Sequence, residues 1–137
     1  MKKKTLKLFE YDQNNSGGTF IENDKLCHKV VIEAYDANEA NEIAQTLGIY
    51  FNGCDDETDC PCCGDRWYQA YADSYLKFPM KWDQDQVFKD EKEYLQHCAD
   101  QWGWTVPDVR VYYKKKKTLE IFSKKQDEPL SITQRTS

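Results

Sequence analysis

Four of the six cysteines lie within residues 54–64, whose sequence is CDDETDCPCCG. This segment contains the pattern C-P-x-C-G, in which Cys60 and Cys63 are the two defining cysteines. Two thiolates three residues apart on a tight turn can share one tetrahedral ion, and a proline followed by a glycine favours that turn. The spacing therefore predicts a zinc knuckle at Cys60 and Cys63.

The remaining ligands of the predicted ion are less well defined than the knuckle. Cys54 is the natural third ligand, because only the acidic segment 55–59 separates it from the knuckle. The fourth is left open between Cys27, His28 and Cys62. Cys62 is nearest in sequence, but the middle residue of a knuckle usually points away from the ion. Cys27 and His28 enter a predicted strand that a folded-over loop could bring close.

A thiolate-rich site of this kind predicts structural rather than catalytic Zn²⁺. Thiolate donation already quenches the Lewis acidity of the ion, and nearby carboxylates disfavour phosphates. A site with three cysteines and a bound water is the catalytic variant. We predict no catalytic residues, because the chain has only two histidines and shows no serine triad or glycosidase-like carboxylate pair. His97 and Cys98 are expected to be a helix-surface residue and a core thiol.

A second candidate site is the segment Gln13-Asn14-Asn15-Ser16-Gly17-Gly18, which follows a predicted strand. It is typical of a wide hairpin turn. The functional alternative is a loop whose small residues let backbone amides approach an anion or a nucleotide. On that alternative, one ligand-binding surface beside the metal would contain Asn14, Asn15, Ser16, Gly17, Gly18, Asn52, Arg66 and Trp67.

Composition limits the class of protein. The 137 residues are 39% hydrophobic and 31% charged, which is typical of a globular domain. The net charge of −5 disfavours nucleic-acid binding, although lysines fill positions 114–117. The chain has neither a signal peptide nor an apolar run of the ~20 residues that span a bilayer, so we expect a cytoplasmic protein that does not bind membranes. With no sign of secretion, metal binding is favoured over disulfides.

Hydrophobic periodicity and turn residues predict an α+β domain. Strands are expected at residues 5–12, 28–35 and 49–51, with an irregular strand at 66–82 and a closing hairpin at 109–113 and 118–122. Helices are expected at 37–47, between an Asp36 cap and Gly48, and at 86–102. We predict a small antiparallel or mixed sheet with two helices on one side. A single domain would span residues 1–122, with the zinc loop at 52–67 and a flexible tail at 123–137.

Two segments together resemble a group of small uncharacterised proteins from tailed bacteriophages. These share a Q-N-N-S-G-G turn, as at residues 13–18, and an N-G-C…D-C-P-C-C-G-D-R-W loop, as at residues 52–67. The resemblance covers residues 5–68. It implies a viral accessory protein in the host cytoplasm, and it brings no activity with it.

The leading hypothesis is a zinc-stabilised phage accessory protein that is not an enzyme. It would bind a host protein or a small-molecule ligand and counter or redirect a host process, for example a defence system. The alternative is a zinc-dependent enzyme acting on a nucleotide or a small signalling molecule. Nucleic-acid binding through the lysine hairpin is the third hypothesis, which the acidic balance disfavours.

Overall fold

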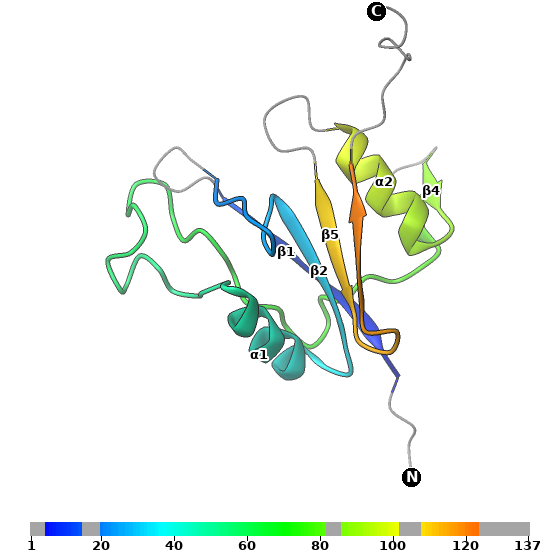
Figure 1. Ribbon diagram of the computed structural model, residues 1–137, viewed down its shortest axis with the longest axis horizontal. Helices are drawn as coiled ribbons and strands as arrows, with labels where there is room; N and C mark the ends of the chain where they lie inside the picture. The colour runs from blue at the N-terminus through cyan, green and yellow to red at the C-terminus, as the bar shows by residue number, and fades with distance from the viewer. Residues whose placement is uncertain (1–4, 15–19, 82–85, 102–107, 124–137) are drawn as a thin grey trace, which may run out of the picture.

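The computed structural model describes residues 5–14, 20–81, 86–101 and 108–123 (Figure 1). These residues form two helices, a four-stranded sheet and a two-stranded sheet, so the predicted α+β class is confirmed. The elements are β1 (Lys7–Asp12), β2 (Lys29–Ala34), α1 (Ala37–Leu47), β3 (Met80–Lys81), β4 (Val87–Phe88), α2 (Glu91–Gln101), β5 (Val109–Tyr113) and β6 (Thr118–Phe122).

The larger sheet is mixed and has the strand order β1-β2-β5-β6. β1 and β2 are antiparallel, with Lys7 opposite Ala34. β2 and β5 are parallel, with Lys29 opposite Val109. β5 and β6 form the antiparallel hairpin that the sequence predicts. The chain between β2 and β5 therefore has to return to the same end of the sheet. It contains both helices and residues 52–66, which we call the cysteine loop.

The two helices cover opposite faces of this sheet, as Figure 1 shows. Val30 and Ile32 of β2 belong to the core cluster that includes α1, whereas Val31 belongs to the cluster that includes α2. The expectation of both helices on one side is therefore wrong. A strand with consecutive apolar residues needs cover on both faces, because successive side chains point in opposite directions. No helix in the described ranges is long and apolar enough to cross a membrane.

Helix α1 begins and ends where the sequence predicts. The side chain of Asp36 accepts a hydrogen bond from the N–H of Glu39 at 2.8 Å. The Glu39 carboxylate reaches back to the N–H of Tyr35 at 2.7 Å, one residue before the cap, rather than to Asp36 itself. Gly48 ends the helix with a φ of 111°, a left-handed conformation that suits glycine.

The predicted strand at 49–51 is wrong, and so is the irregular strand at 66–82. The chain from Ile49 to Phe51 joins no sheet, and in the described part of 66–82 only Met80 and Lys81 are in a strand. The segment 66–79 is instead fixed to the domain by hydrogen bonds from side chains to its backbone. The amide of Asn41 accepts from the N–H of Ala70 at 2.8 Å and donates to its carbonyl at 3.1 Å.

Helix α2 starts later than predicted. Residues 87 and 88 pair with β3, and the helix begins at Glu91. Asp90 explains the start, because its side chain accepts a hydrogen bond from the N–H of Glu93 at 3.0 Å. The predicted end at residue 102 and the tail from residue 124 onward lie outside the described residues.

A buried charged cluster joins α2 to the sheet. Lys29, which is 4% exposed, places its ammonium 2.6 Å from carboxylate oxygens of both Glu10 and Asp12. Tyr94 of α2 donates its hydroxyl to Glu10 at 2.5 Å. Burial alone would lower the pKa of Lys29, but the carboxylates of Asp12 and Glu10 outweigh burial and raise it. The lysine is therefore charged in the folded protein.

We expect Lys29→Met to reduce the free energy of unfolding by about 3 kcal/mol, since it leaves the partly buried Glu10 carboxylate without its cation. A raised lysine pKa stabilises the fold at every pH below the ordinary lysine value and loses this contribution only as the pH rises above that value. The difference from wild type in urea denaturation should therefore stay constant between about pH 6 and pH 9. Lys89→Met, at an exposed lysine, is the matched control and should change stability little.

Candidate functional site

Residues 60–64 adopt the tight turn expected of a knuckle. The carbonyl of Cys60 accepts hydrogen bonds from the N–H groups of Cys63 and Gly64, both at 3.1 Å. Gly64 has a φ of 90°, and a Cβ there would lie 3.2 Å from the hydroxyl of Tyr68. The turn therefore needs glycine at this position for its backbone conformation.

The sulfur of Cys60 lies near the other three cysteines of the loop. Backbone N–H groups of Cys63 and Cys62, and then their thiols, donate hydrogen bonds toward it and lower its pKa. The thiol of Cys54 lies 3.5 Å from the Cys60 carbonyl. Loss of contact with water, followed by the Asp65 carboxylate, raises the pKa of Cys54 to about 11. Backbone N–H groups directed at a sulfur stabilise the thiolate, which is the form of cysteine that binds a metal ion.

The described part of the chain does not form a complete metal site. Within the described residues, no group of three or more His, Cys, Asp or Glu side chains has the geometry to hold a metal ion. All six cysteines are free thiols. The turn that would carry two ligands is thus in place, and zinc binding stays a prediction.

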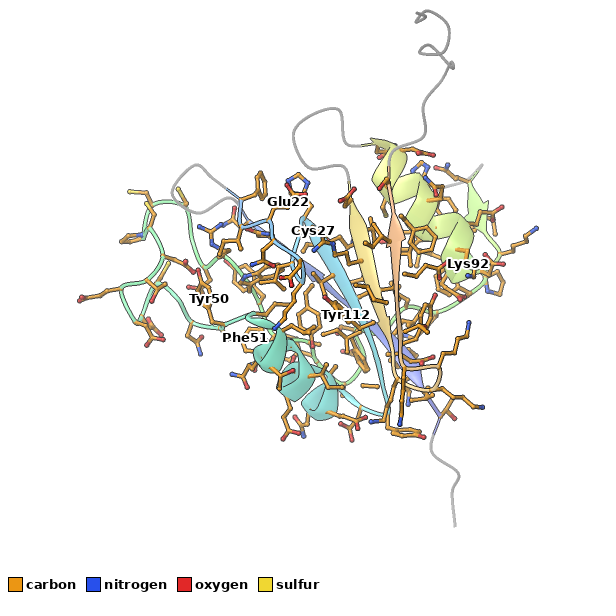
Figure 2. All side chains as sticks on the ribbon, in the orientation of Figure 1. Glu22, Cys27, Tyr50, Phe51, Lys92 and Tyr112 are labelled. Atoms are coloured by element: carbon orange, nitrogen blue, oxygen red, sulfur yellow. The ribbon has the colours of Figure 1, made fainter. Side chains whose placement is uncertain are left out.

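The three candidates for a fourth ligand lie in different surroundings. Cys27 directs its thiol to the carbonyls of Lys29 and Asp108, both at 3.3 Å, and burial raises its pKa to about 11. Figure 2 places it at the start of β2, away from the loop 54–63. The ring of His28 is buried 3.9 Å from the ring of Phe20. Cys62 alone among the three contacts Cys60.

A buried ion pair forms the base of the cysteine loop. The Asp59 side chain is 1% exposed and lies 3.9 Å from the Arg66 guanidinium. Its two oxygens accept hydrogen bonds from the backbone N–H of Arg66 at 2.7 Å and from the hydroxyl of Tyr50 at 2.5 Å. Arg66 also donates to that hydroxyl at 3.1 Å. The two ends of the segment 59–66 are therefore joined directly beneath the knuckle.

Residues at the end of β1 form hydrogen bonds to the second half of the same loop. Asn14 donates its side-chain amide to the carbonyls of Cys63 at 2.7 Å and Asp65 at 3.1 Å. Gln13 accepts a hydrogen bond from Arg66 at 2.9 Å and donates to the carbonyl of Cys27 at 3.0 Å. The structure thus brings Asn14 and Arg66 together beside the cysteines. Asn15, Ser16, Gly17 and Gly18 lie outside the described residues.

The first half of the loop depends on a glycine. A Cβ at Gly53 would lie 1.9 Å from an oxygen of Asp59 and 2.8 Å from the ring of Tyr50. The carbonyl of Gly53 accepts from the N–H groups of Thr58 and Asp59, at 2.8 and 3.0 Å. Asn52 precedes it with a φ of 61° and accepts from the N–H of Asp56 at 3.2 Å. The predicted site residue Asn52 therefore has a turn-forming role.

The comparison with known families gives one match. The family described as "Domain of unknown function (DUF7296)" matches residues 6–118. The chain belongs to this family. No curated protein and no solved structure matches it. The family match covers the cysteine loop together with Asn14, Asp59 and Arg66 at its base, and it carries no function.

Two of the predicted surface residues are buried. Trp67 is fully buried in the core cluster that includes α1, and Arg66 is 8% exposed. Their expected place on an exposed binding surface is therefore wrong. Trp67 packs in the hydrophobic core, and Arg66 pairs with the buried Asp59 carboxylate. The exposed residues of the loop are instead Asn52, the carboxylates at 55–57, Thr58, Pro61, Cys62 and Cys63. Tyr68 lies next to them and is 58% exposed.

Sequence reasoning missed the part that Asp59 and Asp65 play. It treated Asp59 as one of several carboxylates around the metal, yet this side chain forms the base of the loop. Asp65 accepts a hydrogen bond from the N–H of Cys54 at 2.9 Å and so fixes the start of the loop. The available signal was position, since these are the two aspartates that directly flank the knuckle at 60–64.

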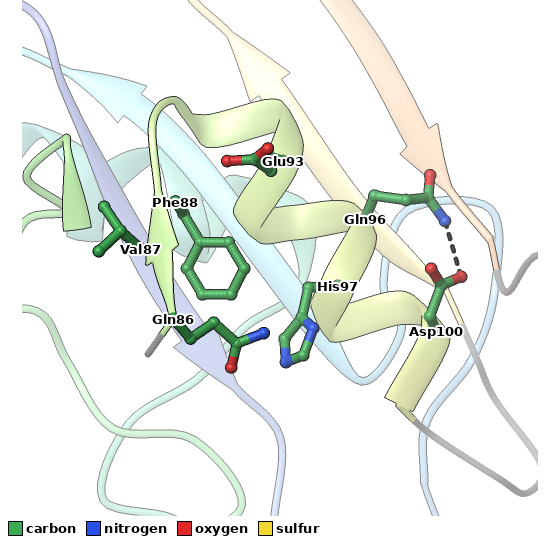
Figure 3. Close-up of a pocket in the computed structure, with 7 residues that line it drawn as sticks. All are labelled: Gln86, Val87, Phe88, Glu93, Gln96, His97 and Asp100. Atoms are coloured by element: carbon green, nitrogen blue, oxygen red, sulfur yellow. Dashed lines mark hydrogen bonds between the residues drawn. The ribbon is translucent and has the colours of Figure 1, made fainter. Parts of the chain in front are cut away.

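A separate cavity lies beside α2 (Figure 3), and α2 and the cysteine loop lie on opposite sides of the molecule in Figure 1. Its volume is about 420 Å³, and it is lined by Gln86, Val87, Phe88, Glu93, Gln96, His97 and Asp100. The His97 ring lies 5.0 Å from that of Phe88, and Gln96 donates to Asp100 at 3.0 Å. This open, polar hollow contains none of the predicted site residues. Cys98 is buried on the same helix, where a core thiol is expected.

We expect Asp59→Asn to reduce the free energy of unfolding by about 3 kcal/mol, because it keeps the size of the side chain and leaves the Arg66 guanidinium buried without its anion. Urea denaturation measures the change. Hydrogen exchange should also accelerate at the amide of Arg66, which loses its charged acceptor. Asp56→Asn, at an exposed position of the same loop, is the control and should change neither. Equal stability of the two variants would contradict the assigned role of the ion pair.

Proposed function

We propose that this protein is a metal-stabilised binding module of a bacteriophage, acting in the host cytoplasm. Its cysteine loop, residues 52–66, binds one Zn²⁺ and presents an acidic surface to a host protein. The observation that supports this most is the preformed turn at 60–64, which directs backbone N–H groups at the sulfur of Cys60. Cys54, Cys60 and Cys63 are the proposed ligands, with Cys62 as the fourth.

The role proposed for the ion is to stabilise the outer half of the loop. Residues 55–58 are exposed and bury no side chain, so their order rests on a few backbone hydrogen bonds. The inner half is held by Asp59, Arg66 and Asn14. A metal ion bound by Cys54 and by the knuckle cysteines would fix both ends of residues 55–58 to this inner half.

Binding is favoured over catalysis by the groups around the loop. Thiolate ligands quench the Lewis acidity of zinc, and both histidines of the chain lie elsewhere, His28 against Phe20 and His97 against Phe88. Arg66, which could stabilise a developing negative charge, is buried and paired with Asp59.

The exposed groups indicate the kind of target. Three successive carboxylates at 55–57 and the ring of Tyr68 are exposed on or beside the loop. Carboxylates pair with lysine and arginine, and tyrosine rings stack on guanidinium groups. A basic protein surface fits this arrangement best.

We expect purified protein to contain about one zinc per chain, and Cys60→Ser to lose it and unfold at a lower temperature. Elemental analysis and thermal denaturation measure the two effects. Cys27→Ser and Cys98→Ser should keep full zinc content, since both thiols lie outside the loop, whereas Cys62→Ser should bind zinc more weakly. Zinc-free wild type, purified under reducing conditions with zinc supplied, would refute the metal site. Loss of zinc in Cys27→Ser would identify Cys27, and not Cys62, as the fourth ligand.

The target can be tested by capture from host cells. Zinc-loaded protein should retain a basic host protein that chelator-treated protein does not, and the retention should weaken with salt. Asp55→Asn, Asp56→Asn and Glu57→Gln combined should abolish it, because the charge is removed while the cysteines stay. Glu22→Gln and Asp24→Asn, exposed carboxylates in another segment, are the matched control. Retention that survives in the triple variant would refute an acidic binding surface.

A further inference from the structure

The two edges of the main sheet differ. At β1, the carbonyl of Leu8 accepts a hydrogen bond from the N–H of Leu76 at 2.8 Å, so the irregular segment after the cysteine loop covers part of that edge. At the other edge, β6 pairs only with β5 among the described residues. β6 is the orange strand of Figure 1. Its outer N–H and C=O groups are a ready template for another extended chain.

One face of β6 carries two exposed apolar side chains. Leu119 is 41% exposed and Ile121 is 49% exposed. They alternate along the strand and lie opposite Tyr112 and Arg110 of β5, on the face that α1 covers farther along the sheet. The segment 23–26 covers that face as far as β5, where Tyr112 donates to the carbonyl of Lys25 at 2.6 Å. This segment does not extend over β6. Leu119 and Ile121 are therefore exposed beside the covered part of the same face.

Charge is distributed unevenly around this edge. The turn before β6 carries the exposed lysines Lys115, Lys116 and Lys117. The only acidic residue of the strand, Glu120, points to the opposite face, where both its oxygens lie 3.1 Å from the ammonium of Lys92. The edge therefore combines an apolar centre with a strongly positive end.

We propose that β6 docks an extended acidic segment of a partner protein by strand addition. The partner's backbone hydrogen-bonds to the outer edge of β6, and its alternate apolar side chains cover Leu119 and Ile121. In antiparallel pairing, the residues that follow this apolar core meet the lysine turn and are acidic. Main-chain bonds supply affinity in this mode of recognition, and the side chains supply specificity.

Charge argues against a second copy of this chain as the occupant. Antiparallel pairing of two β6 strands with Leu119 opposite Ile121 places Glu120 of one copy opposite Glu120 of the other and brings no carboxylate beside either lysine turn. Like charges would therefore meet at the centre, and the lysines would remain unmatched. Nucleic acid would use the lysines but would leave the apolar pair uncovered, so the pair of Leu119 and Ile121 favours a protein segment.

This surface is independent of the proposed zinc loop. No residue of the loop belongs to β6 or to its turn, and in Figure 1 the loop lies at the left of the sheet whereas β6 is its right-hand strand. The zinc-deficient variant Cys60→Ser should therefore still bind through β6, so failure of either proposal leaves the other testable.

The test uses a fluorescein-labelled peptide with a Val-Thr-Val-Thr-Val core followed by a run of aspartates. We expect saturable binding by fluorescence anisotropy that weakens with salt, with amide shifts in NMR spectra confined to Thr118–Phe122 and the lysine turn. Leu119→Thr with Ile121→Thr should weaken binding by about fivefold or more. Lys115→Gln, Lys116→Gln and Lys117→Gln combined should weaken it at least as much. Lys89→Gln is the matched control and should bind as wild type does.

Two control probes separate strand addition from simple charge attraction. A peptide of the same charge with N-methylated core amides should not bind, because it cannot form the ladder, and equal binding by this peptide would overturn the proposal. So would the absence of saturable binding. An oligonucleotide that competes equally at the same amides would assign the surface to nucleic acid. Sedimentation of a dimer that Ile121→Thr dissociates would assign it to a second copy.

Discussion

The contact between the Asp59 carboxylate and Arg66 is the constraint on which the candidate site depends. It joins the two ends of the segment 59–66 beneath the knuckle, one residue before Cys60 and two residues after Gly64. Gly53 makes it possible, since no larger residue leaves room for the carboxylate. Through Gln13, Arg66 is also tied to the entrance of β2, so the loop is attached to the central sheet and not only to its own neighbours.

This attachment divides the loop into a rigid inner part and an exposed outer part. The inner part consists of buried polar groups that hydrogen-bond to one another. Such a network holds the backbone in one conformation, and substitution of any member leaves a buried partner without its hydrogen bond. The outer part carries thiols and carboxylates and almost no apolar surface. Chemistry and recognition thus belong to a part of the chain whose shape does not come from hydrophobic packing.

Features governed by local chemistry could be predicted from the sequence, and those governed by distant partners could not. Asp36 and Gly48 define α1 because caps act within one turn of chain. The knuckle turn and the β5–β6 hairpin were predicted for the same reason. Trp67 was misplaced because its burial depends on Phe9 and Ile32, which are remote in sequence. Placing both helices on one side ignored that β2 is apolar on both of its faces.

The parallel pairing of β2 with β5 has a consequence for the order in which the chain acquires its structure. The pairing joins Lys29 to Val109, so the two central strands pair across 80 positions of the 137-residue sequence. Contacts of such long range close slowly during folding. During synthesis from the N-terminus, β1, β2, α1 and the cysteine loop are complete before the β5–β6 hairpin is made. Until that hairpin arrives, β2 itself is an open strand that a chaperone or a neighbouring nascent chain can engage.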